Sequence, residues 1–465
     1  MTRSSLPALL AAAALLAAPA FAQSSSTVQV TNVNCSDGVA VNGHVAWPAD
    51  DPVWEFDLTR PEASDSGTYP NGFGLEVSNV FYDGRKVFER ANVPVLNVEY
   101  EPGDGCSCYR DWQDSEVGYA VEDDPNNPAP RVSTCFALAG AGEVTTTCEL
   151  AEGGDAGSFE GISFEDYGDE LVLTGHMRAG WYRYRIKWHF YSDGRIWPEY
   201  SYSAASATCT GAAHRHHAYW RFDFDLDGTP TDDVVREHNA AGDEVLFTTE
   251  QDRTWGRAED GVYWSVTDDA TGIGYEIVPG TEDLKLPIDA FSKTDALVLK
   301  YKTAELDDGI TIGNGCAFIY DQLDWANDES IEDEDVVFWY RSSALHEAGN
   351  PWECDIVGPT LRPLGFAVSS GPPPMALGAV EVQAAAPNPT SGSTTVRFRV
   401  DAEQTVRAVL YDALGREVRV LFDGAVRAER YETLEVDAAD LPTGTYVVRV
   451  DGERSSASTR IAIVR

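Results

Sequence analysis

Two histidines separated by one residue, His214 and His216, are the first candidates for chemistry. If they lie on a β-strand, both imidazoles point to the same face, because side chains alternate along a strand. This spacing can bring two ring nitrogens to one metal ion, and imidazole suits copper or zinc. One buried histidine would more often be an ordinary core residue, and His-x-His alone is a weak pattern.

The residues around this pair strengthen the interpretation. Along residues 214–228 one face would be apolar apart from the two imidazoles, and the other would be polar and charged. The first face would carry His214, His216, Ala218, Trp220, Phe222 and Phe224. The second would carry Arg215, His217, Tyr219, Arg221, Asp223, Asp225 and Asp227. Two imidazoles at period two on an aromatic face favour a ligand pair over two separate core residues.

A second strand is predicted over residues 181–191. Tyr182 and Tyr184 would face one way together with three large apolar residues, and basic residues would face the other way. The strand ends at the turn Asp193-Gly194. By itself this pattern is typical of an ordinary amphipathic strand with tyrosines in the core.

The elements that would position these residues are strands. Residues 49–366 are dense in tryptophan, tyrosine and phenylalanine, with short alternating segments separated by Gly, Asp and Asn. Residues 80–88 predict a hairpin closed by Asp83-Gly84. No long helical period follows the N-terminal region, so we predict an all-β fold.

Charge and composition limit the class of protein. The chain has 465 residues with 34 Lys+Arg against 76 Asp+Glu, a formal net charge of −42. Such a surface repels nucleic acid and attracts cations, including protonated amines. A plain solvated acidic surface explains most of this charge better. The 43% hydrophobic content supports a sizeable core and excludes a disordered chain.

The first residues predict export. Residues 1–22 have the basic start, apolar stretch and Ala20-Phe21-Ala22 cleavage site of a signal peptide, and a polar N-terminal segment follows over residues 23–48. No later segment is long and apolar enough to cross a membrane. The eight cysteines of an exported chain suggest disulfides of undetermined connectivity. Cys106-Ser107-Cys108 lacks the second thiol pair that a zinc site would require.

The C-terminal part reads as a separate unit. A Pro/Gly/Ala-rich linker is predicted over residues 367–383. A small β-domain is expected over residues 384–465. Its motifs, in order, are Pro387-Asn388-Pro389, Tyr411-Asp412-Ala413-Leu414-Gly415-Arg416 and Leu441-Pro442-Thr443-Gly444-Thr445-Tyr446. This unit resembles the type A sorting domain of the type IX secretion system. The resemblance implies a β-sandwich, export across the outer membrane of a Gram-negative-type bacterium, and placement at the cell surface or outside the cell.

Residues 70–365 carry a second resemblance, which rests on the order and spacing of several motifs. They are the Gly-Leu to Gly-Arg segment at 74–85, the ungapped His-x-His to Asp-Gly run at 214–228, and the strand 335–340 leading to His346, with Trp352 and Pro359 beyond it. In these motifs the chain resembles the catalytic domain of the copper amine oxidases. The resemblance implies a large antiparallel β-sandwich.

Transferred by position, the family's site residues fall on named residues here. The resemblance implies copper on His214, His216 and His346, and topaquinone formed from Tyr182. It implies Asp114 as the catalytic base and Tyr100 as the hydrogen-bond partner of the quinone. It also implies a peripheral calcium site, a disulfide near Cys135 and Cys148, and a possible homodimer. The calcium ligands would be Asp223, the Phe224 carbonyl, Asp225, Asp335 and the Val336 carbonyl.

The resemblance therefore implies a secreted primary amine oxidase that uses a small primary amine and dioxygen. Two alternatives remain, because Trp181 and Arg183 replace the asparagine and the acidic residue that flank the family's reactive tyrosine. One is a binding or surface protein with the same fold that keeps its metals and forms no quinone. The other is a copper enzyme in which Tyr182 stays unmodified.

Overall fold

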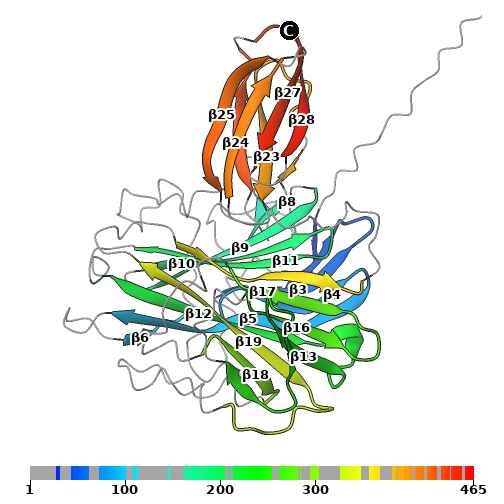
Figure 1. Cartoon of the computed structure of the whole chain (residues 1–465), viewed down its shortest axis with the longest axis vertical. Helices are drawn as coiled ribbons and strands as arrows, with labels where there is room; N and C mark the ends of the chain where they lie inside the picture. Colours follow the sequence, from blue (N-terminus) through cyan, green and yellow to red (C-terminus); the bar gives the residue numbers. More distant parts are fainter. Residues whose placement is uncertain are drawn as a thin grey trace, which may run out of the picture.

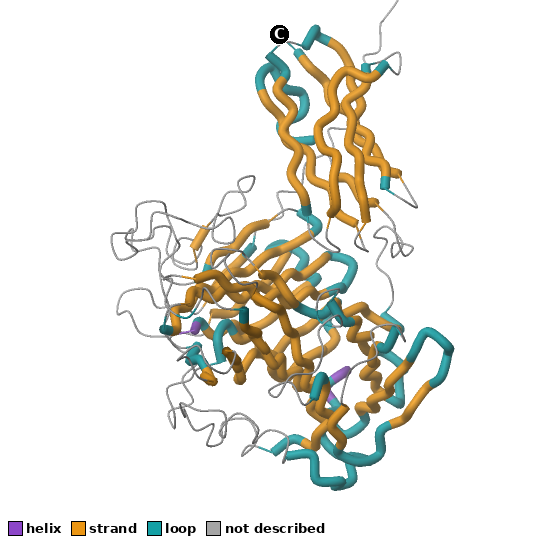
Figure 2. The backbone as a smooth tube through the Cα atoms, turned by 60° about the vertical axis from the view of Figure 1, so that its left-hand side comes forward, coloured by secondary structure: helices purple, strands orange, loops and turns teal. Residues whose placement is uncertain are grey.

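The computed structural model describes most of the chain in segments. The described residues are 28–31, 43–61, 73–100, 108–113, 145–146, 162–166, 168–180, 182–204, 209, 213–253, 261–280, 283, 294–302, 325–346, 355–366, 380–383, 385–400, 404–412, 416–426, 431–439, 441–452 and 456–464. Strands and loops account for nearly all of them, with only short helical turns such as η2 (Leu226–Gly228) (Figure 2). The all-β prediction is confirmed.

The first large sheet has the order β1-β2-β3-β4-β5-β12-β19-β18-β15, with β6 added beside β5 (Figure 1). Every pairing in it is antiparallel. Its strands are β1 (Gln29–Thr31), β2 (Gly43–Trp47), β3 (Trp54–Thr59), β4 (Glu76–Tyr82), β5 (Arg85–Tyr100), β6 (Cys108–Arg110), β12 (His214–Phe224), β15 (Gln251–Arg253), β18 (Ala296–Lys300) and β19 (Val336–His346). Strands β1 and β2 bring part of the predicted polar segment 23–48 into this sheet.

The second large sheet has the order β14-β13-β16-β17-β21-β11-β10-β9-β8-β7, with β20 beside β11. Its strands are β7 (Thr145–Thr146), β8 (Ser163–Asp166), β9 (Glu170–Ala179), β10 (Tyr182–Tyr191), β11 (Ile196–Ala204), β13 (Asp233–His238), β14 (Glu244–Leu246), β16 (Tyr263–Asp268), β17 (Gly274–Val278), β20 (Asp355–Val357) and β21 (Thr360–Leu364). The two sheets pack face to face, so the antiparallel sandwich is confirmed.

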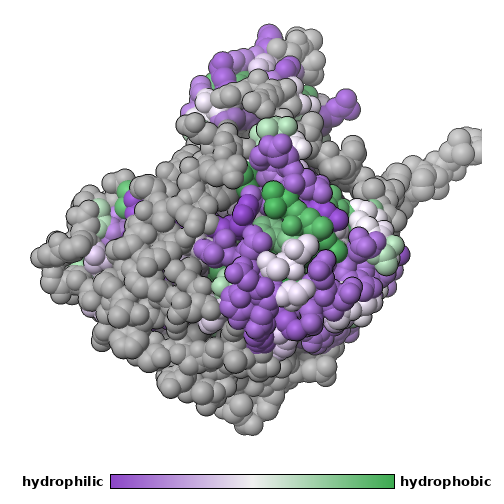
Figure 3. Space-filling view, turned by 60° about the horizontal axis from the view of Figure 1, so that its bottom comes forward, coloured by the Kyte–Doolittle hydropathy of each residue, from purple (hydrophilic) through white to green (hydrophobic). Residues whose placement is uncertain are grey.

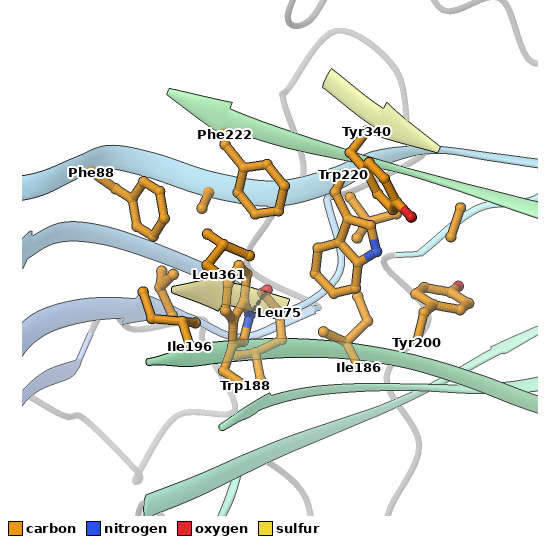
Figure 4. Close-up of a cluster of buried hydrophobic side chains, with 14 of the residues drawn as sticks. Leu75, Phe88, Ile186, Trp188, Ile196, Tyr200, Trp220, Phe222, Tyr340 and Leu361 are labelled. Carbon is orange, nitrogen blue, oxygen red and sulfur yellow. Dashed lines mark hydrogen bonds between the residues drawn. The ribbon is translucent and has the colours of Figure 1, made fainter. Parts of the chain in front are cut away.

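Aromatic side chains fill the space between the two sheets. Trp220 of β12 meets Trp188 of β10 edge to face, with ring centroids 5.3 Å apart (Figure 4). The indole of Trp188 donates a 3.0 Å hydrogen bond to the carbonyl of Leu75, which satisfies its polar atom inside the core. Phe222 lies in the same layer. The predicted alternation therefore holds: the apolar face of residues 214–224 is the core face.

The two predicted turns form as expected. Asp83 and Gly84 connect β4 to β5 with φ of 49° and 71°, a left-handed geometry that suits the twist of a hairpin. Gly194, with φ of 92°, lies between β10 and β11, and its missing side chain leaves room for the ring of Tyr82. Both turns fix the register of strands that carry site residues.

The C-terminal unit has its own core between two smaller sheets, ordered β22-β23-β26 and β25-β24-β27-β28. Its strands are β22 (Val380–Val382), β23 (Ser393–Val400), β24 (Gln404–Tyr411), β25 (Glu417–Val426), β26 (Glu432–Asp437), β27 (Gly444–Asp451) and β28 (Ser456–Ile463). It stands at one end of the large sandwich (Figure 1). Strand β22 lies within the predicted linker 367–383. The domain boundaries themselves stay predictions.

The predicted signal peptide 1–22 lies outside the described residues. Within the described part of the chain, no helix has the length and apolar character needed to cross a membrane. On the face shown in Figure 3, hydrophilic side chains surround a small hydrophobic group. The hydrophilic part of this face agrees with the large excess of acidic residues.

Candidate metal centre

Strand β12 lies at the centre of the site, between β5 and β19. Its register places His214 directly opposite Tyr100 of β5 on one side and His346 of β19 on the other. Three side chains from distant parts of the sequence thus lie in one row across three adjacent strands. His216 follows two residues along β12 and points to the same face.

The ring nitrogens of the three histidines converge between the sheets. Nε2 of His214 lies 3.1 Å from Nε2 of His216. One nitrogen from each of His214, His216 and His346 lies within 4.8 Å of the others. All three side chains are buried. Three imidazoles this close can bind one copper or zinc ion and leave a coordination position open.

Burial favours the neutral form of His216, which is the form that binds a metal. Desolvation lowers the pKa of His216 well below its ordinary value, and repulsion from His214, His346 and His217 lowers it further. A neutral imidazole keeps the lone pair that a metal requires. The site therefore does not need to lose a proton from His216 when an ion binds at neutral pH.

Tyr182 approaches the triad from the opposite sheet. As the first residue of β10, it points its hydroxyl at Nε2 of His214 and lies 3.3 Å from Nδ1 of His346. Its side chain is 1% exposed, so the ring is fully inside. The phenol oxygen is thus within reach of an ion bound by the three histidines. Tyr100 lies in the same site, with its ring stacked on His214 at 4.5 Å.

Two further aromatic residues close the site on the side of β10 and β11. The ring of Tyr202 stacks on His216 at 3.8 Å, and Tyr202 is paired in register with Tyr184. The spacing of Tyr200 and Tyr202 could have predicted that both tyrosines of β11 point to the same face as the site. The sequence analysis did not use this pattern. Together these rings exclude water from the space beside the imidazoles.

Asp111 is a site residue that sequence reasoning missed. Its carboxylate accepts a 2.5 Å hydrogen bond from the hydroxyl of Tyr184, whose oxygen lies 3.4 Å from Nδ1 of His216. Desolvation raises the pKa of Asp111 to about 7, although the Tyr184 hydrogen bond lowers it in part. Asp111 directly follows β6, and its amide donates to the carbonyl of Leu96. A carboxyl group that titrates near neutral pH beside a metal site is suited to proton transfer.

Several predicted site residues fall outside the described residues. Asp114, Cys135 and Cys148 are among them, and so is Trp181. Cys209, which the structure does describe, is disulfide-bonded. The assignment of Asp114 as base and the pairing near Cys135 and Cys148 stay predictions.

The predicted calcium ligands gather at the other end of β12. Asp223 accepts a 3.2 Å hydrogen bond from Arg221, and Asp225 lies 2.5 Å from the ammonium of Lys86. Asp335 immediately precedes β19, and one oxygen of Asp225 and one of Asp335 are buried without a hydrogen-bond partner. Desolvation, followed by repulsion from Asp223 and Asp225, raises the pKa of Asp335 to about 7. Carboxylate oxygens left in this state fit a hard divalent cation.

A fourth carboxylate joins this acidic group. Asp233 of β13 has a buried oxygen without a hydrogen-bond partner. Desolvation raises its pKa to about 8, against the hydrogen bond from the amide of Leu226, and repulsion from Asp225 adds to the shift. The resemblance did not include Asp233. The residue lies in a turn-rich stretch of the sequence, where no local pattern marks it as part of a metal site.

Comparisons with known proteins agree with this architecture. Residues 385–464 match the family model described as "Secretion system C-terminal sorting domain". This match indicates export by type IX secretion to the cell surface or the extracellular space. A search of curated proteins finds no match to the chain.

The solved structures similar to this chain include copper amine oxidases. One is a copper-containing benzylamine oxidase from Hansenula polymorpha, with a TM-score of 0.51 and 14% identity over 70% of this chain and 60% of that one. Others are the Aspergillus nidulans amine oxidase (TM-score 0.46, 13% identity, 70% and 52% covered) and the Pichia pastoris lysyl oxidase (0.45, 12%, 69% and 52%). The first similarity shows a shared fold. The chain spans little more than half the length of these proteins.

Proposed function

We propose that the protein is an exported copper-dependent oxidase of primary amines, with Tyr182 as the precursor of its quinone. The observation that carries the proposal is the position of the Tyr182 hydroxyl between His214 and His346, inside a buried group of three imidazoles. Copper bound by these histidines would lie beside the Tyr182 hydroxyl, and copper with dioxygen would supply the oxidation of its ring. The shared fold supports the same function.

Copper and a quinone at Tyr182 would together supply the oxidation of an amine by dioxygen. The overall reaction converts amine, dioxygen and water into aldehyde, ammonia and hydrogen peroxide, which balances atoms and electrons. His214, His216 and His346 would hold the metal in this proposal. Tyr100 and Tyr202, stacked on two of these histidines, would keep the imidazoles oriented and the space dry.

The proposal assigns the proton-accepting role to Asp111. Its pKa of about 7 lets a large fraction of the carboxyl accept a proton at neutral pH, and Tyr184 fixes its orientation. Asp114, the base implied by the resemblance, is the competing assignment. Asp111→Asn and Asp114→Asn separate the two, because only loss of the true base should lower kcat by several orders of magnitude.

The proposal is tested by adding copper to the purified metal-free protein in air. We expect a visible quinone band, a positive quinone redox stain, and a mass increase on the peptide that contains Tyr182. Metal-free protein kept without oxygen is the matched control and should show none of these. Copper binding with an unchanged Tyr182 mass would refute the quinone.

A second function is favoured by one specific observation. Trp181 and Arg183 flank Tyr182 where the amine oxidases carry asparagine and an acidic residue. If the test gives copper without quinone, the protein is either a copper enzyme with unmodified Tyr182 or a surface protein that only binds metal. Oxidation of a test substrate by the copper form then separates these two.

We also propose a calcium ion bound by the carboxylates of Asp223, Asp225 and Asp335 with the carbonyls of Phe224 and Val336. The support is the pair of buried carboxylate oxygens without hydrogen-bond partners, which a cation would satisfy. Metal analysis after dialysis should find calcium in the wild type and less in Asp335→Asn. A homodimer, also proposed from the resemblance, is tested by light scattering.

A further inference from the structure

The C-terminal unit contacts the large sandwich through charged and polar groups. Arg397 of β23 donates a 3.3 Å hydrogen bond to Glu170 at the start of β9. Gln383 donates at 2.6 Å to one oxygen of Asp169, and the hydroxyl of Tyr431 donates at 3.3 Å to the other. These contacts lie where the two units meet at the β8–β9 end of the sandwich (Figure 1).

Arg399 is buried between the two units. Its guanidinium lies over the ring of Tyr191 in the large sandwich, 4.5 Å from the centroid, and its side chain is 3% exposed. Within the C-terminal unit it binds Glu381 at 2.6 Å. An arginine placed in this way has exchanged water for an aromatic face and a carboxylate across a desolvated contact.

On the large sandwich, the buried carboxylate of Glu170 faces the arginines of the C-terminal unit. Glu170 is 2% exposed and accepts a 2.8 Å hydrogen bond from His189 on its inner side. Its outer oxygen is the one that faces Arg397. Burial raises the pKa of Glu170, but His189 and the two arginines outweigh this effect and lower the pKa overall.

The charge of the chain is divided unevenly between the two units. Residues 384–465 contain eleven arginines and twelve acidic residues, whereas residues 1–383 contain 23 Lys+Arg against 64 Asp+Glu. The C-terminal unit is thus nearly neutral, and the rest of the chain is strongly anionic. The anionic part of the chain therefore attracts the arginines that the C-terminal unit presents, and it repels acidic surfaces.

We propose that Glu170 and Tyr191 form a docking site for two guanidinium groups, with Arg397 hydrogen-bonded to Glu170 and Arg399 stacked on Tyr191, which holds the sorting domain in one fixed position on the large sandwich. Both arginines alternate along β23 with Val396, Phe398 and Val400, which face the core of the C-terminal unit. The arginine face of β23 therefore serves the contact between the units, and the fold of the sorting domain rests on the opposite face.

The proposal is tested by small-angle X-ray scattering on the full chain at physiological salt. The wild type should scatter as one rigid particle, and Arg397→Ala/Arg399→Ala should show a larger radius of gyration and maximum dimension. Truncating one side of a buried charge pair corresponds to an increase of about thirtyfold or more in the population of undocked molecules. Arg449→Ala is the matched control, because Arg449 is an exposed arginine of the same unit paired with Asp451.

A second variant, on the large sandwich, keeps the test valid if the double arginine variant does not fold. Glu170→Gln keeps the size of the side chain, removes its charge from the large sandwich, and should also release the sorting domain. Hydrogen exchange of the amides at the start of β9 should speed up in both variants and stay unchanged in Arg449→Ala. A wild type that already scatters as two independent units, or variants that scatter like the wild type, would overturn the proposal.

Discussion

Replacing Asp111 with asparagine tests whether the site holds a carboxyl group with a pKa near neutrality. Asparagine has nearly the same shape, and its carbonyl oxygen can still accept the hydrogen bond from Tyr184. The substitution therefore removes the ionisation of Asp111 and leaves the packing in place. The expected result is a change in stability that depends on pH.

The magnitude follows from the pKa. Burial raises the pKa of Asp111 to about 7, whereas an unfolded aspartate titrates near 3.9. The folded state thus binds this proton more tightly than the unfolded state does. The proton bound to Asp111 stabilises the folded wild type fully below pH ~4, and this stabilisation is lost as the pH rises through ~7. Three pKa units correspond to an upper limit of about 4 kcal/mol. Asp111 is only part-buried, so we expect about 2 kcal/mol.

The assay is urea unfolding of metal-free protein at pH 5 and pH 8. All twelve tryptophans precede residue 367, so their fluorescence reports on the large sandwich alone. The free energy of unfolding of Asp111→Asn, relative to that of the wild type, should be higher at pH 8 than at pH 5, because the wild type loses most of the benefit of the bound proton between these two values. Asp252→Asn is the control for the same change of residue at an exposed position outside the metal site. An equal effect of Asp111→Asn at both pH values would refute the raised pKa.

Three further predictions concern the metal site and a turn. His346→Ala should weaken copper binding more than about a hundredfold in a competition titration. Removing a residue that only supports a metal ligand lowers metal affinity by about 10- to 100-fold, and removing the ligand itself should lower it further. An unchanged affinity would show that His346 is not a ligand. Tyr182→Phe should keep copper binding and abolish the visible band, and a band that persists would place the quinone elsewhere. Gly194→Ala should cost about 2–4 kcal/mol in thermal or urea unfolding, because φ is +92° and a Cβ would lie 2.6 Å from the ring of Tyr82. Gly84→Ala, with φ of +71° and open space around it, should cost only about 1 kcal/mol.

Local patterns in the sequence were sufficient for the strands that carry the site. Period-two alternation placed His214 and His216 on the core face of β12, and it placed Tyr182 on the core face of β10. The Asp83-Gly84 turn could be read directly, because only a few residue types tolerate its backbone geometry. The three C-terminal motifs predicted a sorting domain, which the family match confirms.

Contacts between distant segments could not be read from such patterns. His346 is 164 positions from Tyr182, and only the pairing of β19 with β12 brings it opposite His214. The resemblance suggested this residue, but the alternation around it did not. Asp111 and Asp233 were missed because their roles depend on desolvation by neighbours from other strands. The docking of Arg397 on Glu170 joins two units with separate cores.

The sequence by itself therefore determined the strand faces, the turns and the sorting domain, because each depends on neighbouring residues along the chain. Only the tertiary structure decided which imidazoles meet, which carboxyl groups lose their water, and which arginines lie between the two units. Side-chain direction is a local property of a strand, whereas burial and electrostatic coupling are set by everything that packs around a group.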